Sequence, residues 1–485
     1  MAKHYDKLIF EISSDGKEGY LLPDTGVEGD FSKDAIPEEL ARADEPVLPR
    51  VSEPEAVRHF TRLSQENYGV DGGFYPLGSC TMKYNPKINE DAAAMEAFCG
   101  LHPCQPESDA QGVLRLMYEL GEMLSEITGM AQFSLQPAAG AHGELSGLMI
   151  FKAWHEKNGQ ADRKRIIVPD SSHGTNPASA AEAGFEIVQI KSAADGTVDI
   201  DALAAALDDK TAGLMLTNPN TLGLFETRIG EIADMVHSAG GLLYYDGANM
   251  NAIMGYARPG DMGFDVVHVN THKTFSTPHG GGGPGAGPIG VSAALAPYLP
   301  GPVVARSGDF YTLEAAGENS IGKVRSFYGS IGVLVRAWCY IKTMGGDGLK
   351  SASETAVLNA NYLKELLKGK YKLPYDVVCK HEFVLDGLAE AQGGVRTLDV
   401  AKRLIDLGYH PPTIYFPLIV ENAIMIEPTE TESLETLDSF AEAMLRVADE
   451  AVSCPDILLE APTTALVRRI DELKAAKEPV LVWQG

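Results

Sequence analysis

The sequence predicts an α/β protein with a mostly parallel sheet and a smaller α+β domain toward the C-terminus. Between about residues 110 and 300, short β-branched, apolar runs alternate with helical stretches. The runs are apolar almost throughout, which is typical of strands covered by helices on both faces. Ligands of such sheets bind beyond the carboxyl ends of the strands, so the residues that follow each strand are the first candidates for a site.

The large domain is expected to begin its alternating pattern with two helices. The first covers residues 112–128, and the second begins near Gly140 and reaches about Glu156. Strands are expected at 165–169, 185–190, 213–217, 242–245 and 266–269. Helices at 199–207 and 229–239 separate several of these strands, which completes the pattern of a parallel sheet.

A glycine-rich break at 345–348 marks the start of the smaller domain. Residues 1 to about 55 are polar and contain scattered prolines, so we expect an extended arm there. The expected organisation is an N-terminal arm and extension at 1–70, a large domain at 71–344 and a small domain at 345–485. In the small domain we expect helices at 349–369, 397–407 and 433–451, and strands at 376–385, 414–418 and 423–426.

Charge and cysteine content restrict the classes of function. The 485 residues include 40 Lys and Arg against 67 Asp and Glu, a net charge of −27. This balance disfavours nucleic-acid binding and gives no basic membrane patch, and no apolar run is long enough to span a bilayer. Six cysteines are too few for a disulfide scaffold, and the N-terminus lacks a signal-peptide pattern, so we expect a cytoplasmic protein.

Two polar residues follow neighbouring apolar runs of the predicted sheet. Asp246 ends the run 242–245, and Lys273 follows the run 266–269. Alone, the first suggests a turn or helix cap, and the second suggests a solvated surface lysine. Together at one sheet edge they can serve a single ligand. Pyridoxal 5'-phosphate (PLP) needs this pair, because a lysine forms an imine with it and a carboxylate keeps its pyridine nitrogen protonated.

Other residues after the predicted strands could complete such a site. Gly140 and Ala141 lie in a run of small residues that leads into a helix, where backbone N–H groups can bind a phosphate; close helix packing is the alternative. His173 could stack on the pyridine ring, or belong to a capping turn. Asn218 could donate to the phenolic oxygen of the cofactor, or form an Asn-Pro turn.

Several competing motifs are incomplete. Residues 280–285 match a dinucleotide fingerprint but include Pro284 and lack the later acid, and residues 317–323 resemble a P-loop followed by Val324 in place of Ser or Thr. A soft-metal site could be formed by Cys99, His102 and Cys104, but these are only three local ligands. Ordinary buried thiols are therefore the favoured interpretation, and we expect no metal. The tetraglycine at 280–283 fits a flexible linker, or backbone packed against the cofactor site or a facing subunit.

Several long runs resemble the glycine cleavage system P-protein family, and most closely the second subunit of its two-subunit form. The runs are DGANMN (246–251), HVNTHKTFSTPHGGGGPG (268–285), YPLGSCTMK (75–83), LQPAAGAHGEL (135–145), DSSHGTNPASA (170–180) and MIEPTETES (425–433). The resemblance extends from about residue 70 to the C-terminus. It departs from the family at Ser276 and Thr277, where apolar residues or cysteine are usual, and we expect no mechanistic consequence.

The resemblance implies a fold type I PLP-dependent transferase and assigns roles to residues of the site. Lys273 would form the imine with the cofactor, Asp246 would pair with the pyridine nitrogen, and His173 would stack on the ring. The remaining implied cofactor-binding residues are Ala248 against the other ring face, Gly140 and Ala141 at the phosphate, His272 and Thr271 nearby, and Asn218.

The implied activity is that of an aminomethyl-transferring glycine dehydrogenase, a PLP-dependent oxidoreductase. Glycine would be decarboxylated and its aminomethyl group passed to the lipoyl arm of the glycine cleavage H-protein. The implied partners are glycine dehydrogenase subunit 1, with two copies of each subunit, and lipoylated H-protein. Three alternatives stay open: another fold type I PLP enzyme acting on glycine or a small amino acid, a non-catalytic assembly subunit, and a nucleotide-binding protein.

Overall fold

The computed structural model describes residues 7–21, 23–24, 26, 36–44, 46–102, 105–280 and 285–483. The chain separates into two units, one formed by Val70–Pro462 and the other by Met1–Gly69 with Thr463–Gly485. Cys104 of the weighed metal cluster, and residues 281–284 of the glycine-rich run, lie outside the described residues. None of the helices within the described ranges is long and apolar enough to cross a membrane.

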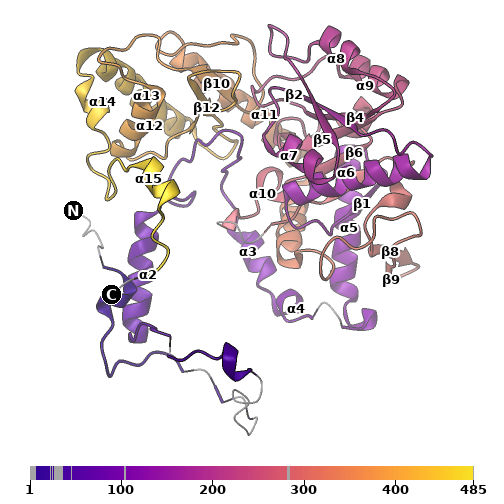
Figure 1. Cartoon of the computed structure of the whole chain (residues 1–485), viewed down its shortest axis with the longest axis horizontal. Helices are drawn as coiled ribbons and strands as arrows, with labels where there is room; N and C mark the ends of the chain where they lie inside the picture. Colours follow the sequence, from indigo (N-terminus) through magenta and orange to yellow (C-terminus); the bar gives the residue numbers. More distant parts are fainter. Residues whose placement is uncertain are drawn as a thin grey trace. The chain divides into compact units, whose positions relative to one another are not determined.

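Val70–Pro462 contains the parallel sheet that the sequence predicts (Figure 1). Among the described residues the sheet has seven strands in the order β1-β7-β6-β5-β4-β2-β3. The five strands from β6 to β3 in this order pair in parallel, and β7 and β1 add an antiparallel edge. The strands are β1 (Gln132–Ser134), β2 (Arg165–Pro169), β3 (Glu186–Ile190), β4 (Thr211–Thr217), β5 (Leu242–Gly247), β6 (Val266–Val269) and β7 (Ile289–Val291).

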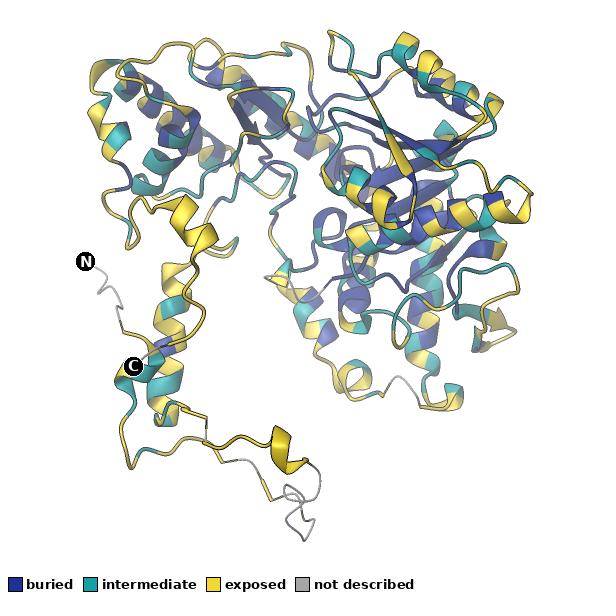
Figure 2. Ribbon diagram, in the orientation of Figure 1, coloured by how far each residue is buried: buried dark blue, intermediate teal, exposed yellow. Residues whose placement is uncertain are grey.

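Helices cover both faces of this sheet, because its central strands are apolar on both sides (Figure 2). One face packs against α5 (Gln111–Thr128), α8 (Ile200–Ala206) and α9 (Ile229–Ser238). The other packs against α6 (Gly140–Lys157) and α7 (Thr175–Glu182). Other elements are α3 (Lys87–Ala93), α4 (Glu96–Cys99), α10 (Thr271–Thr274), the hairpin β8 (Val303–Ser307) and β9 (Phe310–Glu314), and 3-10 turns at Glu107–Asp109, Met250–Ala252, Pro259–Met262 and Ala296–Tyr298.

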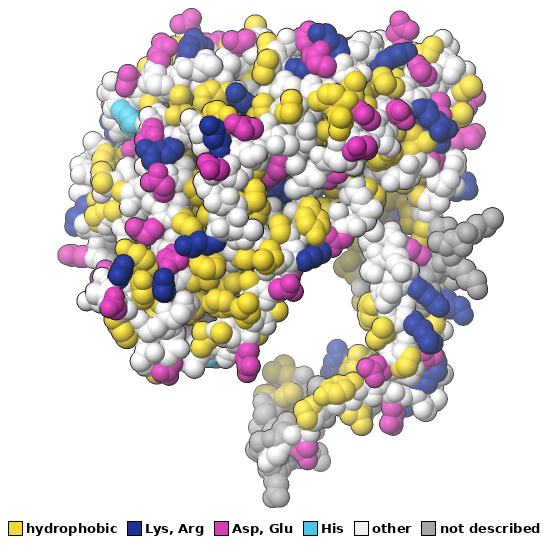
Figure 3. Space-filling view, turned by 180° about the vertical axis from the view of Figure 1, so that it is seen from behind, with side chains coloured by type: hydrophobic (Ala, Val, Ile, Leu, Met, Phe, Trp, Pro, Cys, Tyr) yellow, Lys and Arg dark blue, Asp and Glu magenta, His cyan; other side chains and the backbone are white. Residues whose placement is uncertain are grey.

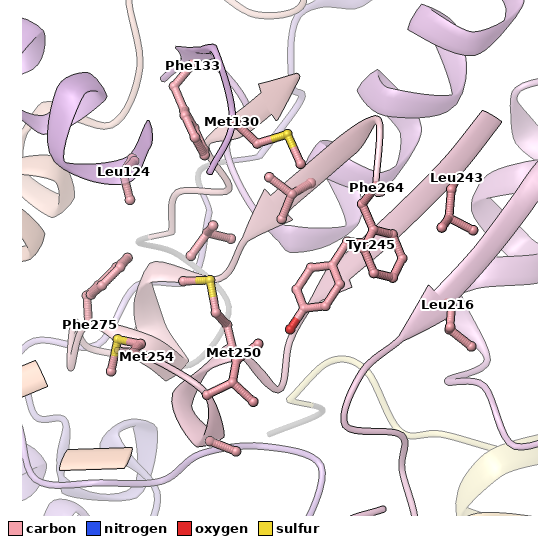
Figure 4. Close-up of a cluster of buried hydrophobic side chains, with 14 of the residues drawn as sticks. Leu124, Met130, Phe133, Leu216, Leu243, Tyr245, Met250, Met254, Phe264 and Phe275 are labelled. Atoms are coloured by element: carbon pink, nitrogen blue, oxygen red, sulfur yellow. The ribbon is translucent and has the colours of Figure 1, made fainter. Parts of the chain in front are cut away.

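Alternation along β5 sends its two tyrosines to opposite faces of the sheet. Tyr245 packs into the cluster shown in Figure 4, with its ring edge-to-face against Phe264 at 5.0 Å between centroids. Tyr244 lies in the core on the α6 face. Because Asp246 is two residues after Tyr244, its side chain also points toward the α6 face, which places it at the end of the sheet beside the start of α6.

The smaller α+β region follows a long helical element, α11 (Ile331–Leu367), which is interrupted at Gly345 by a non-helical backbone (φ 62°, ψ −179°). The predicted domain boundary after residue 344 stays a prediction, because Val70–Pro462 forms one compact unit. A three-stranded antiparallel sheet, β10-β12-β11, packs against α11 and α13. Its elements are β10 (Phe383–Asp386), α12 (Thr397–Asp406), β11 (Thr413–Ile414), β12 (Ala423–Ile426), α13 (Leu434–Ser453) and α14 (Asp456–Glu460).

The terminal unit, Met1–Gly69 with Thr463–Gly485, has few buried side chains. Its main helix, α2 (Glu53–Glu66), starts with a capping box formed by Ser52 and Glu55, and Lys17 pairs with Glu55 at 2.7 Å. The rings of Phe10 and Trp483 stack at 4.8 Å, so the two ends of the chain contact each other. The unit also contains α15 (Glu472–Lys477) and 3-10 turns at Ile9–Ile12 and Glu38–Leu40.

Charged side chains are dispersed over the surface of Val70–Pro462 that Figure 3 shows. On this face, acidic and basic side chains are interspersed with hydrophobic and uncharged ones. The chain's net charge of −27 is therefore not visible there as one acidic patch.

Candidate active site

A pocket of about 450 Å³ lies at the carboxyl ends of β5 and β6, where the sequence places the site. It brings together most of the predicted residues, which come from four separate strand-to-helix connections. The predicted residues that line it are Gly140, Ala141, His173, Asp246, Ala248, His272 and Lys273.

Lys273 lies in α10, the short helical turn that follows β6. Its side chain is buried, and its Nζ donates a hydrogen bond to the Ser79 carbonyl oxygen at 2.8 Å. The Ser79 backbone N–H donates in turn to Glu382 Oε2 at 2.8 Å, and Ser79 has a positive φ of 66°. The loop Gly78–Cys80 therefore forms a fixed wall of the pocket, held between Lys273 and the smaller α+β region.

Asp246 is buried at the end of β5 and is surrounded by donors. Its Oδ2 accepts from Asn176 Nδ2 at 2.8 Å, and its Oδ1 accepts from the Ala248 N–H at 3.0 Å. Burial favours the neutral acid, but the interactions with His268, Asn176 and Lys273 outweigh it and hold the pKa of Asp246 below its usual value. The carboxylate is therefore ionised and suited to a cationic ring nitrogen.

The first turn of α6 provides the opposite end of the pocket. The residue before the helix, Ala139, offers no side-chain cap, so no side chain occupies the first backbone N–H groups. A Cβ on Gly140 would lie 2.5 Å from Asn270 Nδ2, so only glycine lets the backbone approach this closely. The buried Asn270 Oδ1 has no hydrogen-bond partner among the described residues. The uncapped N–H groups and the close backbone approach at Gly140 fit an anionic group such as a phosphate, whereas Asn270 Oδ1 can only accept from a donor.

Histidines without charge line the space between these two ends. Burial, and then the nearby Lys273, lower the pKa of His173, whose Nδ1 lies 2.9 Å from Thr175 Oγ1. The His173 ring packs edge-to-face on Phe416, with 5.5 Å between centroids. Burial lowers the pKa of His272 to about 3. A neutral imidazole at position 173 is suited to stacking on an aromatic ring.

A cysteine also lines the pocket. Cys80 Sγ lies 3.2 Å from His279 Nε2, and burial raises the pKa of this thiol. Burial lowers the pKa of His279 to about 4, so the pair is a neutral thiol beside a neutral imidazole.

Two predicted residues do not line the pocket. Asn218 Oδ1 accepts from the Glu226 N–H at 2.9 Å, and Thr271 Oγ1 donates to the Ala286 carbonyl oxygen at 3.1 Å. Both side chains are buried and bonded within the protein. Their assignment to the cofactor stays a prediction.

A buried acid cluster lies behind the Ser79 wall. Donor atoms of His381, Glu382 and Glu427 lie within 4.8 Å of one another, a set that could hold a metal ion by donor type. Burial raises the pKa of Glu382 to about 7, and burial together with Glu382 raises that of Glu427. The raised pKa values favour the protonated forms of Glu382 and Glu427, which reduces the negative charge of the cluster.

Lys83 connects its own run, 75–83, to three other runs that carry the family resemblance. Its buried Nζ donates to Glu430 at 2.7 Å, to Asn251 Oδ1 at 2.8 Å and to the Thr274 carbonyl oxygen at 2.9 Å. The last contact is one residue from Lys273, so this cation supports the turn that carries Lys273.

Replacing Lys83 with methionine should destabilise the protein by about 3–5 kcal/mol, because it leaves Glu430 buried without its cation. Chemical denaturation monitored by circular dichroism measures the loss. The matched control is Lys87→Met, whose exposed pair with Asp71 should contribute less than about 1 kcal/mol. Equal stabilities of the two variants would contradict the role of Lys83.

Known proteins resemble this chain in fold and in sequence. A solved structure of glycine decarboxylase (P-protein) of the glycine cleavage system, in inhibitor-bound form, aligns with a TM-score of 0.72 at 20% identity, over 86% of this chain and 94% of that one. Glutamate decarboxylase of Lactobacillus brevis aligns with a TM-score of 0.65 at 14% identity, over 87% and 97%. The fold is that of the fold type I PLP-dependent enzymes, as predicted.

Sequence comparisons narrow this class to one family. The family described as "Glycine cleavage system P-protein" matches residues 14–316, and "Glycine dehydrogenase, C-terminal domain" matches residues 352–467. "Probable glycine dehydrogenase (decarboxylating) subunit 2" of Caldanaerobacter subterraneus subsp. tengcongensis is 64% identical over 100% of both chains. The protein of the same name from Alkaliphilus oremlandii is 61% identical over 100% of this chain and 99% of its own. The chain belongs to the glycine cleavage system P-protein family, and the predicted likeness to its subunit 2 form is confirmed.

Proposed function

We propose that this chain binds PLP in the pocket at the ends of β5 and β6, decarboxylates glycine there, and passes the aminomethyl group to the lipoyl arm of the H-protein. The observation that carries the proposal is the meeting of Lys273 and Asp246 in one pocket, opposite the uncapped start of α6. Membership of the P-protein family supports glycine as the substrate and the lipoyl arm as the acceptor.

Each end of the pocket would hold a different part of the cofactor. Lys273 would attach it covalently, Asp246 would bind its ring nitrogen, and Gly140 and Ala141 would bind its phosphate. His173 and Ala248 would lie against the two faces of its ring. When bound, PLP supplies an electron sink for the bond that breaks at the substrate α-carbon.

Asp246 and Lys273 have separate tasks in this reaction. The ionised Asp246 carboxylate would hold a proton on the ring nitrogen, which a neutral side chain would do poorly. The Ser79 carbonyl oxygen, 2.8 Å from Lys273 Nζ, would accept a hydrogen bond from this amine whenever it is not joined to the cofactor. The wall formed by residues 78–80 would therefore hold the free lysine in place.

The pocket wall favours loss of a carboxylate over its retention. Lys273 is the only lysine or arginine among the described residues that line it, and His173 and His272 have lowered pKa values. A substrate carboxylate would find no arginine clamp there to stabilise its charge. Loss of neutral CO₂ would move this negative charge away from the unsupported carboxylate to the electron sink that the bound cofactor supplies, which would lower the barrier to decarboxylation.

The chain should need a partner subunit for full activity. Its relatives are named as subunit 2 proteins and match it over their full length, so we propose a complex with glycine dehydrogenase subunit 1 that contains two copies of each chain. Glycine-dependent CO₂ release, measured with lipoylated H-protein, should rise at least about tenfold when subunit 1 is added. Light scattering should show the mass of the heterotetramer.

Product analysis tests the acceptor separately. With lipoylated H-protein, the complex should release CO₂ from glycine and load the aminomethyl group on the lipoyl arm; with unlipoylated H-protein it should not. Full activity of the chain alone would refute the two-subunit assembly. Equal turnover without the lipoyl group would instead favour another PLP enzyme that acts on glycine.

A further inference from the structure

Asp246 contacts His268, and through it Tyr244, and neither of these two residues lines the pocket. His268 Nε2 lies 3.3 Å from Asp246 Oδ1, and His268 Nδ1 lies 2.7 Å from the Tyr244 hydroxyl. The three side chains are almost completely buried, and nothing in the proposed function employs Tyr244 or His268.

The strand register explains why these three residues meet. Tyr244 and Asp246 are two residues apart on β5, so they project from the same face of the sheet. Asp246 pairs with His268 across the parallel β5–β6 ladder, which places His268 beside it on that face. All three residues of the row Tyr244–His268–Asp246 therefore lie in strands of the sheet, and none lies in a loop.

Tyr244 and His268 are joined by a short contact between the hydroxyl and Nδ1. Burial, with the neighbouring Glu144 and Asp246, raises the pKa of Tyr244 well above its usual value, so the hydroxyl keeps its proton. With that proton the hydroxyl can donate to His268 Nδ1, and a doubly protonated imidazole would donate to the hydroxyl oxygen instead. In either case His268 Nε2 carries a proton and lies 3.3 Å from Asp246 Oδ1, because an unprotonated Nε2 would set a lone pair against the carboxylate.

Helix α6 holds both supporting side chains in place. Gly143 and Gly147 lie one turn apart on the helix face toward the sheet. A Cβ on Gly143 would lie 2.8 Å from the His268 Cβ, and a Cβ on Gly147 would overlap the Tyr244 ring. Helix α6 therefore lines the pocket with its first turn and packs against Tyr244 and His268 with its next two turns.

We propose that Tyr244 and His268 are positioning residues that fix the orientation of the Asp246 carboxylate toward the pyridine nitrogen of the bound cofactor. This inference rests on the proposed PLP site. Asn176, which donates to Asp246 Oδ2 and also contacts Glu144, braces the second carboxylate oxygen. With both oxygens held, the carboxylate does not need to reorganise when the cofactor binds.

The test compares cofactor affinities in full-length chains assembled with subunit 1. Tyr244→Phe removes only the hydroxyl that hydrogen-bonds to His268 Nδ1. The matched control is Tyr371→Phe, which removes a buried hydroxyl bonded to the Met444 carbonyl oxygen in the smaller α+β region. The probes are PLP and 1-deazapyridoxal 5'-phosphate, which has a C–H in place of the ring nitrogen. Dissociation constants are measured by absorbance titration of the cofactor-free protein.

Tyr244→Phe should bind PLP about tenfold more weakly than Tyr371→Phe and the wild type, while all three bind the deaza analogue equally. His268→Leu should lose more PLP affinity than Tyr244→Phe, and His268→Gln, which keeps a donor to Asp246, should recover part of that loss. Unchanged PLP affinity in Tyr244→Phe would overturn the inference, as would equal losses for both probes. A wild type that takes up no PLP would instead overturn the proposed function, and this inference with it.

Discussion

Lys273→Ala should abolish covalent attachment of the cofactor and lower glycine-dependent CO₂ release by at least about a thousandfold. The pocket has no other lysine among its described lining residues, so no neighbouring amine can replace Nζ. Lys273→Arg should be as inactive, because a guanidinium keeps the charge but is not a usable amine. CO₂ release by the complex with subunit 1 and lipoylated H-protein measures the loss.

The exposed Lys87 provides the control for this substitution, since Lys87→Ala should keep full activity. All three variants should unfold at similar temperatures, because the Lys273 side chain makes a single hydrogen bond within the described residues, to the Ser79 carbonyl oxygen. Substantial CO₂ release by Lys273→Ala would remove this residue from the chemistry.

Asp246→Asn should keep the fold and still bind the cofactor, yet lower turnover by at least about a hundredfold. The amide is nearly isosteric with the carboxylate but carries no charge to hold a proton on the ring nitrogen. It also offers only one acceptor oxygen, although Asp246 receives donors on both of its oxygens. Steady-state kinetics should show the loss mainly in kcat.

Asp170→Asn is the matched control, because Asp170 also follows a strand. Its Oδ1 alone accepts from the Ser192 N–H and hydroxyl, contacts that an amide oxygen can keep. This variant should retain near-normal turnover. If Asp246→Asn were as active as Asp170→Asn, the carboxylate would not be the partner of the ring nitrogen.

The central sheet could be predicted from the sequence because its middle strands β4, β5 and β6 are mostly apolar and are buried along their whole length. The strands at 165–169 and 266–269 have the predicted bounds. The antiparallel edge strands β1 and β7 were not predicted, since three residues carry too short a pattern. The expected strand at 376–385 is wrong over most of its length: β10 is Phe383–Asp386, and the apolar Val377 and Val378 are exposed.

The expectation that ligands bind beyond the carboxyl ends of parallel strands predicted the place of the pocket. It does not predict the direction in which each side chain points. It predicted Asp246 and Lys273, which share the pocket, and by the same reasoning Asn218, whose amide instead bonds to Glu226. Ser79 and Phe416 line the pocket from distant parts of the chain, and no local pattern signals such contacts. The Tyr244–His268 pair needed the β5–β6 register, which a sequence does not display.

Borohydride reduction followed by peptide mapping tests the central proposal most directly. The purified chain, assembled with subunit 1 and loaded with PLP, is reduced, digested and analysed by mass spectrometry. The reduced cofactor should be found on the peptide that contains Lys273, and Lys273→Ala should show no labelled peptide. A label on any other lysine, or no label in the wild type, would contradict a PLP site at the ends of β5 and β6.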